Sequence, residues 1–537
     1  MKVCKYQRLK QQISYDGINW SDTGLYATGD LIERDSQDCG YVPGYVFTFQ
    51  NGQDTLSTSV TSGASAYTIG VISTFGGLLT GFTASESLDW LSVTTSLTGI
   101  TISVSGNTGD TRNGTVTLTQ SGSNYTCTVV VTQETSMGGQ YLTLEATQNN
   151  FTFKSTSALS YSTNEGSTWT SLAENTNSPS FASGTSIMLK ANLTPVSYNG
   201  VGTISSNGSY KAYGNPLSLI YGDYFNGYTS VPANAFAKLF YCSTGLTDAS
   251  NLSLPATTLA DSCYYDMFQG CKSLRTAPAL PATTLASSCY LSMFQGCSSL
   301  TSVQQTLPAT TLAESCYYRM FGNCTSLTTA PSLPATTLAN ECYMNMFNGC
   351  TSLATAPVLS ATTLTDYCYQ QMFLDCEALT TAPSLPATTL ADSCYYNMFS
   401  GCTSLTTAPS LPATTLTDWC YAEMFKGCTS LTTAPALSAT TLASYCYMNM
   451  FQGCTSLTTA PELPATTLAN RCYYGMFHGC SSLNYIKTLA TDISADMCTY
   501  DWVRSVAQSG TFIKNPSMSS WTSGWNGIPN NWTVQNA

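Results

Sequence analysis

The chain has 537 residues, of which 18 are Lys or Arg, 30 are Asp or Glu and one is His, giving a formal net charge of −12. Charged residues make up 9% of the chain, against about 25% in a typical soluble domain, while the hydrophobic fraction of 43% is ample for a core. The shortage of bases argues against a nucleic-acid partner, which needs Lys and Arg patches, and the single His removes most acid–base chemistry near neutral pH.

The chain begins Met-Lys-Val-Cys-Lys-Tyr, which is basic but is followed by no apolar run, so we expect no secretory signal peptide. No stretch reaches the roughly 18 consecutive apolar residues of a transmembrane helix, so we expect no membrane insertion. The 23 cysteines are therefore expected to stay as thiols in a reducing cytosol.

Residues 1–45 are predicted to form an N-terminal attachment module, and 11 of the first 40 residues are charged. The motif Ser-Tyr-Asp-Gly-Ile-Asn-Trp at 14–20, followed by Gly-Asp-Leu-Ile-Glu-Arg-Asp at 29–35, resembles the N-terminal module of virion proteins from Bacteroidetes phages, including crAss-like phages. The resemblance implies docking to other virion proteins. An ordinary terminal β-hairpin is the alternative.

Residues 46–135 are predicted to form a β-sandwich, because apolar residues alternate with Thr and turn signals separate the alternating stretches. Trp90, followed by Thr-Arg-Asn-Gly-Thr-Val-Thr-Leu-Thr-Gln at 111–120, resembles a BACON domain. The resemblance implies an immunoglobulin-like sandwich with glycan or mucin binding. We expect Trp90 to anchor the core rather than to bind sugar. The other aromatic candidates for a sugar site are few: Tyr67, Phe75 and Tyr125.

Residues 136–235 are predicted to form a second β domain. The sequence Ser-Thr-Asn-Glu-Gly-Ser-Thr-Trp at 162–169 resembles an Asp-box hairpin, in which the Asn164 side chain bonds the backbone and Gly166 takes the tight position. A single copy of this structural motif implies no sialidase activity.

Residues 236–483 carry a 26-residue repeat whose first cysteine recurs from Cys263 to Cys472, with one spacing of 27. Nine full repeats follow a degenerate first one, and the period lies in the leucine-rich-repeat range of about 20–29 residues. Ser-Leu-Thr-Thr-Ala-Pro predicts a short strand. Leu259, Cys263 and Met267 follow one another at i, i+4 and i+8, which predicts a helical turn or two. Because one repeat cannot bury its apolar face alone, we expect neighbouring repeats to stack into a solenoid.

Two residue types recur with the unit, and each has a structural interpretation. The second cysteine follows the first by eight positions, which suits neither a disulfide nor a zinc site, so we expect ladders of buried thiols and no metal or cofactor. An acid three residues after Thr resembles a helix capping box. A paired-carboxylate glycosidase site is the functional alternative, but nothing singles out one pair, so we expect no enzyme activity. The pairs are Thr258/Asp261, Thr311/Glu314, Thr363/Asp366, Thr389/Asp392 and Thr415/Asp418.

The residue before the first cysteine and the residue before Met differ from repeat to repeat. Drift on a solvent-facing surface would explain this variation. Large side chains at these positions would instead recognise a ligand on one face of the solenoid. The candidate ligand-binding residues are Arg319, Tyr367, Trp419, Tyr445 and Arg471.

The unit Cys-Tyr-x-x-Met-Phe-x-Gly-Cys-x-Ser-Leu resembles the BspA-like leucine-rich repeats of gut Bacteroidales and their phages. The resemblance implies adhesion and protein or glycan binding, not catalysis. Residues 484–537 are predicted to cap the array. Within them, 495–507 with Trp502 predicts a capping helix, and 521–532 resembles the segment that closes such arrays.

The expected fold class is multidomain, with all-β immunoglobulin-like sandwiches followed by an α/β leucine-rich-repeat solenoid. The expected function is that of a phage virion structural protein, a head or tail fibre or decoration protein that displays domains binding host-surface or mucin glycans. A bacterial cell-surface leucine-rich-repeat adhesin is the alternative, and a glycan-degrading enzyme comes third. A virion protein would be made in the host cytoplasm and could assemble as a homodimer or homotrimer.

Overall fold

The computed structural model describes residues 140–301, 303–519 and 521–537, and before residue 140 it describes Leu88, Trp90 and the strands named below. Residues 1–140 and 141–537 form two units. The described parts are nearly all β, and none of their sheets closes into a barrel. Their helices are α1 (Ser218–Tyr221) and the 3₁₀ helix η1 (Gly222–Tyr224), and no described helix is long and apolar enough to cross a membrane.

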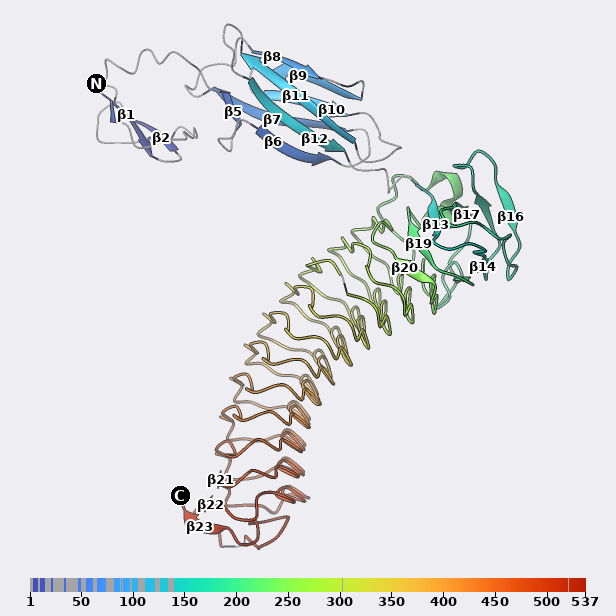
Figure 1. The fold of residues 1–537 in the computed structure, drawn as a ribbon. Coiled ribbons are helices and arrows are strands. Elements are labelled where there is room, and N and C mark those ends of the chain that lie inside the picture. The colour runs from blue at the N-terminus through green and yellow to red at the C-terminus, as the bar shows by residue number, and fades with distance from the viewer. Residues whose placement is uncertain are drawn as a thin grey trace. The chain divides into compact units, whose positions relative to one another are not determined.

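The first unit begins with an antiparallel sheet of strand order β3-β2-β1-β4 (Figure 1). Its strands are β1 (Val3–Gln7), β2 (Lys10–Ser14), β3 (Ser21–Asp22) and β4 (Glu33–Arg34). The predicted attachment module at 1–45 falls on this sheet, but its side chains lie outside the described residues.

Two further four-stranded sheets have the orders β5-β7-β10-β9 and β6-β12-β11-β8, with β6 parallel to β12 and the other pairs antiparallel. Val116 and Leu118 of β11 are buried while the Thr residues beside them are partly exposed, as the alternation predicts. Trp90 is partly buried, and a Cβ added at Gly114 would lie 2.9 Å from its ring, so the indole lies against β11. The side chains of Tyr67, Phe75 and Tyr125 are outside the described residues. The strands are β5 (Phe47–Phe49), β6 (Thr55–Val60), β7 (Ser65–Ser73), β8 (Phe82–Glu86), β9 (Leu91–Ser96), β10 (Gly99–Val104), β11 (Arg112–Gln120) and β12 (Thr126–Gln133).

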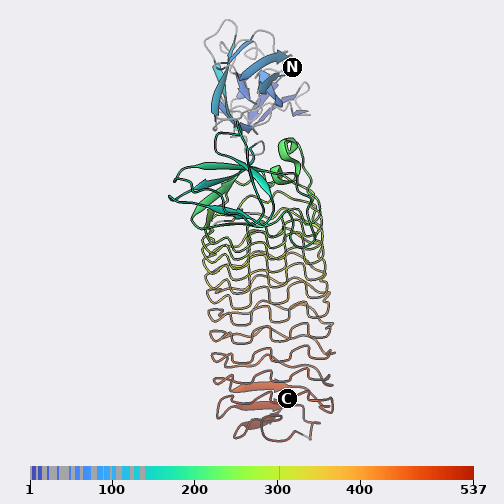
Figure 2. The ribbon, with the colours of Figure 1, turned by 90° about the vertical axis from the view of Figure 1, so that its right-hand side faces the viewer.

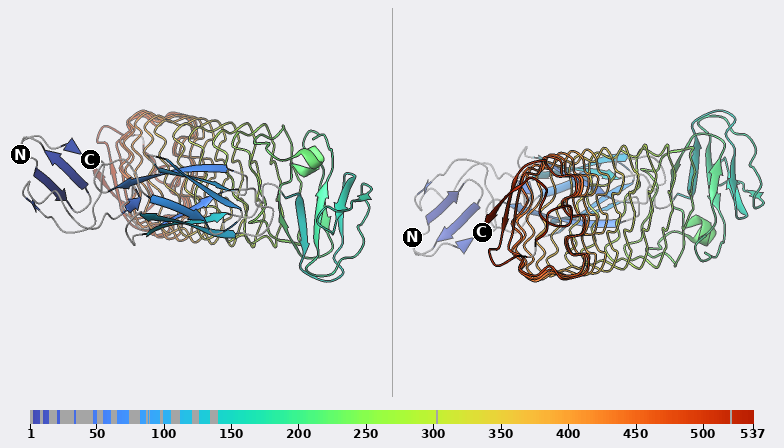
Figure 3. Two further views of the ribbon diagram at one scale, coloured as in Figure 1. Left: turned by 90° about the horizontal axis from the view of Figure 1, so that it is seen from above. Right: turned by 90° about the horizontal axis from the view of Figure 1, so that it is seen from below.

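The second unit opens with a six-stranded sheet of order β16-β15-β17-β13-β19-β20 and a separate β14–β18 pair. Helix α1 lies beside these strands at one end of the array of repeats (Figure 3). The last pairing, β19 with β20, is parallel and is followed by further parallel bridges such as Asp248 with Thr276. The sheet therefore runs directly into the repeats, and one hydrophobic core extends from Leu142 to Trp532. The strands are β13 (Leu142–Ala146), β14 (Phe153–Ser155), β15 (Leu159–Ser162), β16 (Thr170–Leu172), β17 (Ser186–Lys190), β18 (Ile204–Ser206), β19 (Tyr210–Tyr213) and β20 (Leu246–Asp248).

Strands β15 and β16 form the predicted Asp-box-like hairpin. The Ser162 hydroxyl accepts from the Gly166 N–H at 3.0 Å, and Asn164 Oδ1 accepts from the Thr168 N–H at 3.0 Å. Gly166 has φ 81°, the left-handed conformation that favours glycine. The prediction for this turn is confirmed.

The repeats form a stack of coils, which we number 1–10 by their first cysteine from Cys263 to Cys498. Figure 2 shows them as parallel wavy lines stacked down the array. The predicted strand shrinks to one residue per coil, since the second Thr forms a single parallel bridge to its equivalent, as between Thr329 and Thr355. The proline that follows two residues later has no N–H with which to extend the ladder.

The predicted helix in each repeat is wrong, because the segment around the first cysteine is a chain of turns. Positive φ angles recur every fourth residue, at Ser262, Asp266 and Gly270 in coil 1, and no α-helix passes through such residues. Backbone N–H groups alternate in direction: Met267 donates to Tyr264 three residues back, whereas Phe268 donates to Met293 in the next coil. The expected α/β solenoid is thus an all-β stack of coils among the described residues.

The interior of the stack consists of ladders of identical side chains. Phe rings of adjacent coils lie 5.3–5.8 Å apart and Tyr rings 5.6–6.2 Å apart, nearly parallel. Each second cysteine from Cys271 to Cys480 is buried and donates its S–H to a Phe carbonyl of the preceding coil, at 3.0–3.2 Å. The expected ladders of buried thiols are confirmed.

The acids of the predicted capping boxes have a different partner, because there is no helix to cap. Asp261 Oδ1 accepts from the Ser287 N–H at 3.2 Å, and Asp418 Oδ1 accepts from the Ser444 N–H at 2.9 Å. These two carboxylates therefore satisfy backbone donors of the next coil.

The C-terminal segment closes the stack with a parallel sheet of β21 (Tyr485–Thr488), β22 (Thr511–Lys514) and β23 (Thr533–Asn536). The predicted helix at 495–507 is wrong, because Cys498 begins a tenth coil with the same chain of turns. The fully buried Trp502 ring stacks on Trp521 at 5.4 Å, and its Nε1 donates to the Gly527 carbonyl at 2.8 Å. An indole thus covers the apolar end of the stack.

Candidate binding face

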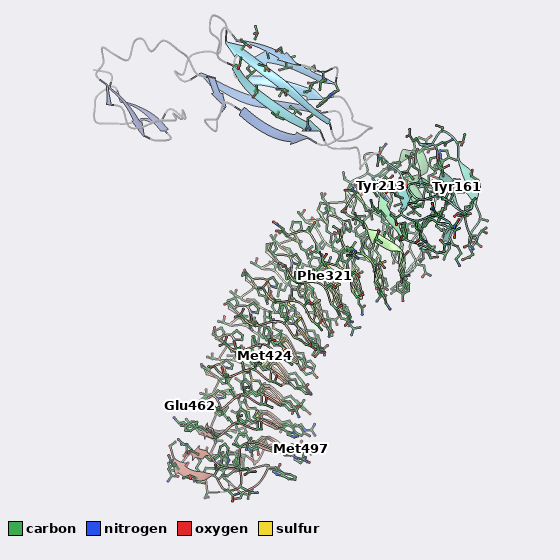
Figure 4. All side chains as sticks on the ribbon, in the orientation of Figure 1. Tyr161, Tyr213, Phe321, Met424, Glu462 and Met497 are labelled. Atoms are coloured by element: carbon green, nitrogen blue, oxygen red, sulfur yellow. The ribbon has the colours of Figure 1, made fainter. Side chains whose placement is uncertain are left out.

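The chain of turns sorts side chains into buried and outward-facing positions. The first cysteine and the Tyr, Met, Phe and second cysteine that follow it are buried from coil 1 to coil 9. Four positions before and between them differ between coils, and we call their side chains the outer face; in coil 1 these are Ser262, Tyr265 and Gln269, which are partly exposed, and Asp266, which is buried. Phe321 and Met424 lie inside the stack, and Met497 of the outer face and Glu462 lie on opposite sides of it (Figure 4). The positions that vary around the first cysteine and the Met therefore belong to the outer face.

Two of these four positions have left-handed backbone in every coil. The residue before the first cysteine has φ between 47° and 61°, and the residue before Met has φ between 51° and 58°. The residue before Met is Ser, Asn, Asp or Gly in six of coils 1–9, whereas the residue before the first cysteine is Ser in four of the ten coils and a larger residue in the other six. Large side chains in it cost about 1 kcal/mol or more, and such strain gathers at functional sites. All five residues predicted to bind ligand occupy these strained positions: Arg319, Tyr367, Trp419, Tyr445 and Arg471.

Three of the predicted residues meet in adjacent coils, in what we call the aromatic stack. The rings of Trp419 and Tyr445 lie 4.1 Å apart with planes 8° from parallel. Arg471 lies over the Tyr445 ring at 5.4 Å, and its Nη1 donates to the Tyr445 hydroxyl at 2.7 Å. All three side chains are partly exposed. The stack therefore presents aromatic surface beside fixed hydrogen-bonding groups.

Two residues that the sequence reasoning missed flank this stack. Tyr396 meets the Trp419 ring edge-to-face at 5.9 Å, and Asp496 Oδ2 lies 3.5 Å from Arg471 Nη2. Burial, with the nearby Glu423 carboxylate, raises the pKa of Tyr396, so its hydroxyl stays protonated and able to donate. Tyr396 lies two residues after the first cysteine of coil 6. This position differs between repeats, and that variation is the sequence signal that could have identified Tyr396.

The other two predicted residues lie apart from the stack. Tyr367 is 41% exposed and stands two coils before Trp419, with Ser393 at the equivalent position between them. Arg319 occupies the position before Met in coil 3, where its guanidinium lies 5.4 Å from the Tyr318 ring. The structure thus groups three of the five candidates.

Among the described residues, no cluster of side chains suits a metal ion, and several carboxylates bond backbone groups. Residues that the structure describes contain no group of three His, Cys, Asp or Glu side chains able to hold a metal ion. At the repeated acid position, the carboxylates of Asp261, Asp366 and Asp418 accept from backbone N–H groups of the next coil, as Asp366 does from the Asp392 N–H at 3.1 Å. The arrangement is suited to binding through aromatic contacts and hydrogen bonds.

Comparison with protein families matches two parts of the chain. Residues 80–134 match the BACON family, described as "Putative binding domain, N-terminal", and residues 239–406 and 392–501 match the BspA type leucine-rich repeat region. Both of these resemblances seen in the sequence are confirmed. Together the two families indicate a surface-binding or adhesin-like protein.

No curated protein matches the chain. Among solved structures, an endo-fucoidan hydrolase from glycoside hydrolase family 107 matches with a TM-score of 0.15 and 17% identity, covering 24% of this chain and 18% of that one. The chain thus spans less than a fifth of that structure's length, and a likeness this slight carries no argument about fold or function.

Proposed function

We propose that this chain is a non-enzymatic adhesion protein that binds glycans on a host surface or in mucin through the outer face of its repeats. In this proposal the BACON-like region is an immunoglobulin-like sandwich, and the repeats form a leucine-rich-repeat solenoid that displays the outer face.

The observation that carries the proposal is the aromatic stack of Trp419, Tyr445 and Arg471. Aromatic rings bind the apolar C–H faces of sugars, and guanidinium and phenol groups hydrogen-bond their hydroxyls. Its three side chains stand on a left-handed backbone position that every coil keeps, so the scaffold holds them at a fixed place in successive coils.

We further propose that the protein is a fibre or decoration protein of a phage virion, docked to other virion proteins through residues 1–45. The motifs at 14–20 and 29–35 support this setting by their resemblance to phage virion modules. A bacterial cell-surface adhesin is the second candidate, supported by the match to BspA type repeats. Immunogold electron microscopy of virions and of host cells distinguishes the two.

The binding proposal is tested by pull-down on immobilised mucin and on a glycan array, with chromatography of the glycans after incubation. We expect retention of the wild-type protein without turnover and loss of retention in Trp419→Ala. Tyr224→Ala is the matched control, because Tyr224 is 82% exposed and lies in η1, away from the outer face. Glycan cleavage, or equal retention of Trp419→Ala and wild type, would contradict the proposal.

A further inference from the structure

The outer face continues beyond the aromatic stack to the C-terminal end of the array. Tyr474 and Tyr500 occupy the same outward position in coils 9 and 10, with rings 5.3 Å apart and 22° from parallel. Tyr500 is 45% exposed, and Met497, before the first cysteine of coil 10, is 46% exposed. Trp525 is 58% exposed and lies 4.6 Å from the Arg504 guanidinium.

Apart from Trp525, these side chains come from two neighbouring positions of coils 6 to 10, the residue before the first cysteine and the residue two after it, so they form one strip along the array. The strip starts at Tyr396 in coil 6 and ends at Trp525, which is held over coil 10 by the Val503 N–H donating to its carbonyl at 3.2 Å. Four steps between coils at the usual strand spacing of about 4.8 Å make it on the order of 20 Å long. The members of the strip are Tyr396, Trp419, Tyr445, Arg471, Tyr474, Met497, Tyr500 and Trp525.

Arg471 of the strip and two bases beside it, Lys426 and Arg504, already have carboxylate partners within the protein. Lys426 lies 2.9 Å from Glu423, Arg471 lies 3.5 Å from Asp496, and Arg504 lies 3.7 Å from Asp501. Because these charges are compensated in place, the strip has little attraction for a polyanion. Its chemistry favours an uncharged partner with apolar faces and hydroxyl groups.

We propose that this strip binds an extended, uncharged, linear polysaccharide that lies along the array, with several sugar rings bound at once. The proposal rests on the proposed glycan-binding function and specifies its ligand. A surface that repeats once per coil suits a polymer with a regular repeat, which gains affinity from each added ring until the strip is covered. A folded protein partner would not gain affinity in this stepwise way.

The test uses the full chain in affinity electrophoresis with soluble β-glucan, xyloglucan, arabinoxylan and galactomannan, and with polygalacturonate and heparin as polyanions. We expect retardation by one or more of the neutral polymers, retained at about 0.5 M NaCl, where screening removes long-range electrostatic attraction. Calorimetry with oligosaccharides of the positive polymer should show affinity rising about tenfold or more from short to long chains.

Two variants separate this inference from the proposed function. Trp525→Ala should abolish the gain with chain length while leaving the affinity for short chains, whereas Trp419→Ala should weaken both; Tyr224→Ala is the control. Binding that does not depend on chain length, binding unaffected by Trp525→Ala, or salt-sensitive binding of polyanions alone would overturn the inference and leave glycan binding standing. Absence of binding to any glycan preparation, or capture of a protein ligand alone, would overturn both proposals.

Discussion

The rings of Trp419 and Tyr445 lie 4.1 Å apart and 8° from parallel although 26 residues separate them in the chain. The backbone fixes this contact, because the Trp419 N–H donates to Ser444 and the Tyr445 N–H donates to Asn470, each in the next coil. Any side chain at this position therefore meets its equivalents in the coils on either side. Residues at the same position of successive repeats, 26 residues apart in the sequence, therefore lie side by side on one surface of the stack.

The 27-residue repeat between Cys289 and Cys316 should depend on Gln304. Leu280 and Leu307 occupy equivalent positions in successive repeats. The Leu307 N–H donates to the Ser332 carbonyl, whereas the Leu280 N–H donates to the side-chain oxygen Gln304 Oε1 at 2.6 Å. Gln304 Nε2 in turn donates to the Leu280 carbonyl at 3.0 Å. The side-chain amide replaces the backbone group that the extra residue displaces.

Gln304→Ala should therefore lower the free energy of unfolding by about 1–3 kcal/mol, the usual loss when buried backbone groups lose a partner. Urea denaturation of Gln304→Ala and of Gln305→Ala, whose side chain is exposed, provides the matched pair. Equal stability of the two variants would show that the amide is dispensable.

The stacking of repeats and the identity of the buried positions could be predicted from the sequence, because each core position recurs in every coil. The local backbone could not. A spacing of four residues between Leu259, Cys263 and Met267 fits a helix and fits equally a chain of four-residue turns. What separates them is the recurrence of Ser, Asn, Asp and Gly at the left-handed positions, seen in Asn397 and Gly401 of coil 6.

The candidate site was found in part for a similar reason. Comparing repeats identified the residues that precede the first cysteine in coils 7, 8 and 9, which are Trp419, Tyr445 and Arg471. Tyr396 and Asp496 occupy other positions of the repeat. They join the aromatic stack through contacts that only the fold creates: Tyr396 meets the Trp419 ring edge-to-face, and Asp496 forms an ion pair with Arg471. Comparing residues at one position of the repeat does not reveal contacts between residues at different positions.

Two substitutions at left-handed positions should have opposite effects on stability. Ser393 has φ 55°, and Ser393→Gly should stabilise the protein by about 0.5–1 kcal/mol, because glycine adopts this conformation without steric cost. Gly427 has φ 73° and a Cβ there would lie 3.7 Å from its nearest neighbour, so Gly427→Ala should cost about 1 kcal/mol from conformation alone. Thermal or urea unfolding gives both values; changes of the same sign would contradict the assignment of strain.

The thiols should differ sharply in reactivity. Burial raises the pKa of the Cys350 thiol to about 12 and that of Cys376 well above its ordinary value, so both the thiolate fraction and the access of a reagent are low. Cys242 is exposed. Iodoacetamide followed by peptide mass spectrometry should modify Cys242 in the folded protein and the repeat cysteines only after denaturation. Rapid labelling of the repeat peptides under native conditions would show that the ladders open.

The stability of the first coil should depend on pH through Asp266. Burial raises the pKa of this carboxyl to about 6, and the Lys238 ammonium and the Tyr265 hydroxyl offset only part of the rise. The folded state thus keeps the proton up to about pH 6, whereas the unfolded state releases it near pH 3.8. Because the folded state binds more protons between these values, stability falls as the pH rises through that window and stays low above it.

Asp266→Asn removes this ionisation and keeps a residue that the same position already holds at Asn345, Asn397 and Asn449. The variant should be more stable than the wild type above about pH 6 and should match it below about pH 4. Hydrogen exchange of the coil 1 amides at both pH values measures the difference, with Glu174→Gln at an exposed acid as the control. A constant difference between variant and wild type across the window would mean that the carboxyl does not titrate there, since only a group that changes its protonation between the two pH values makes the difference vary.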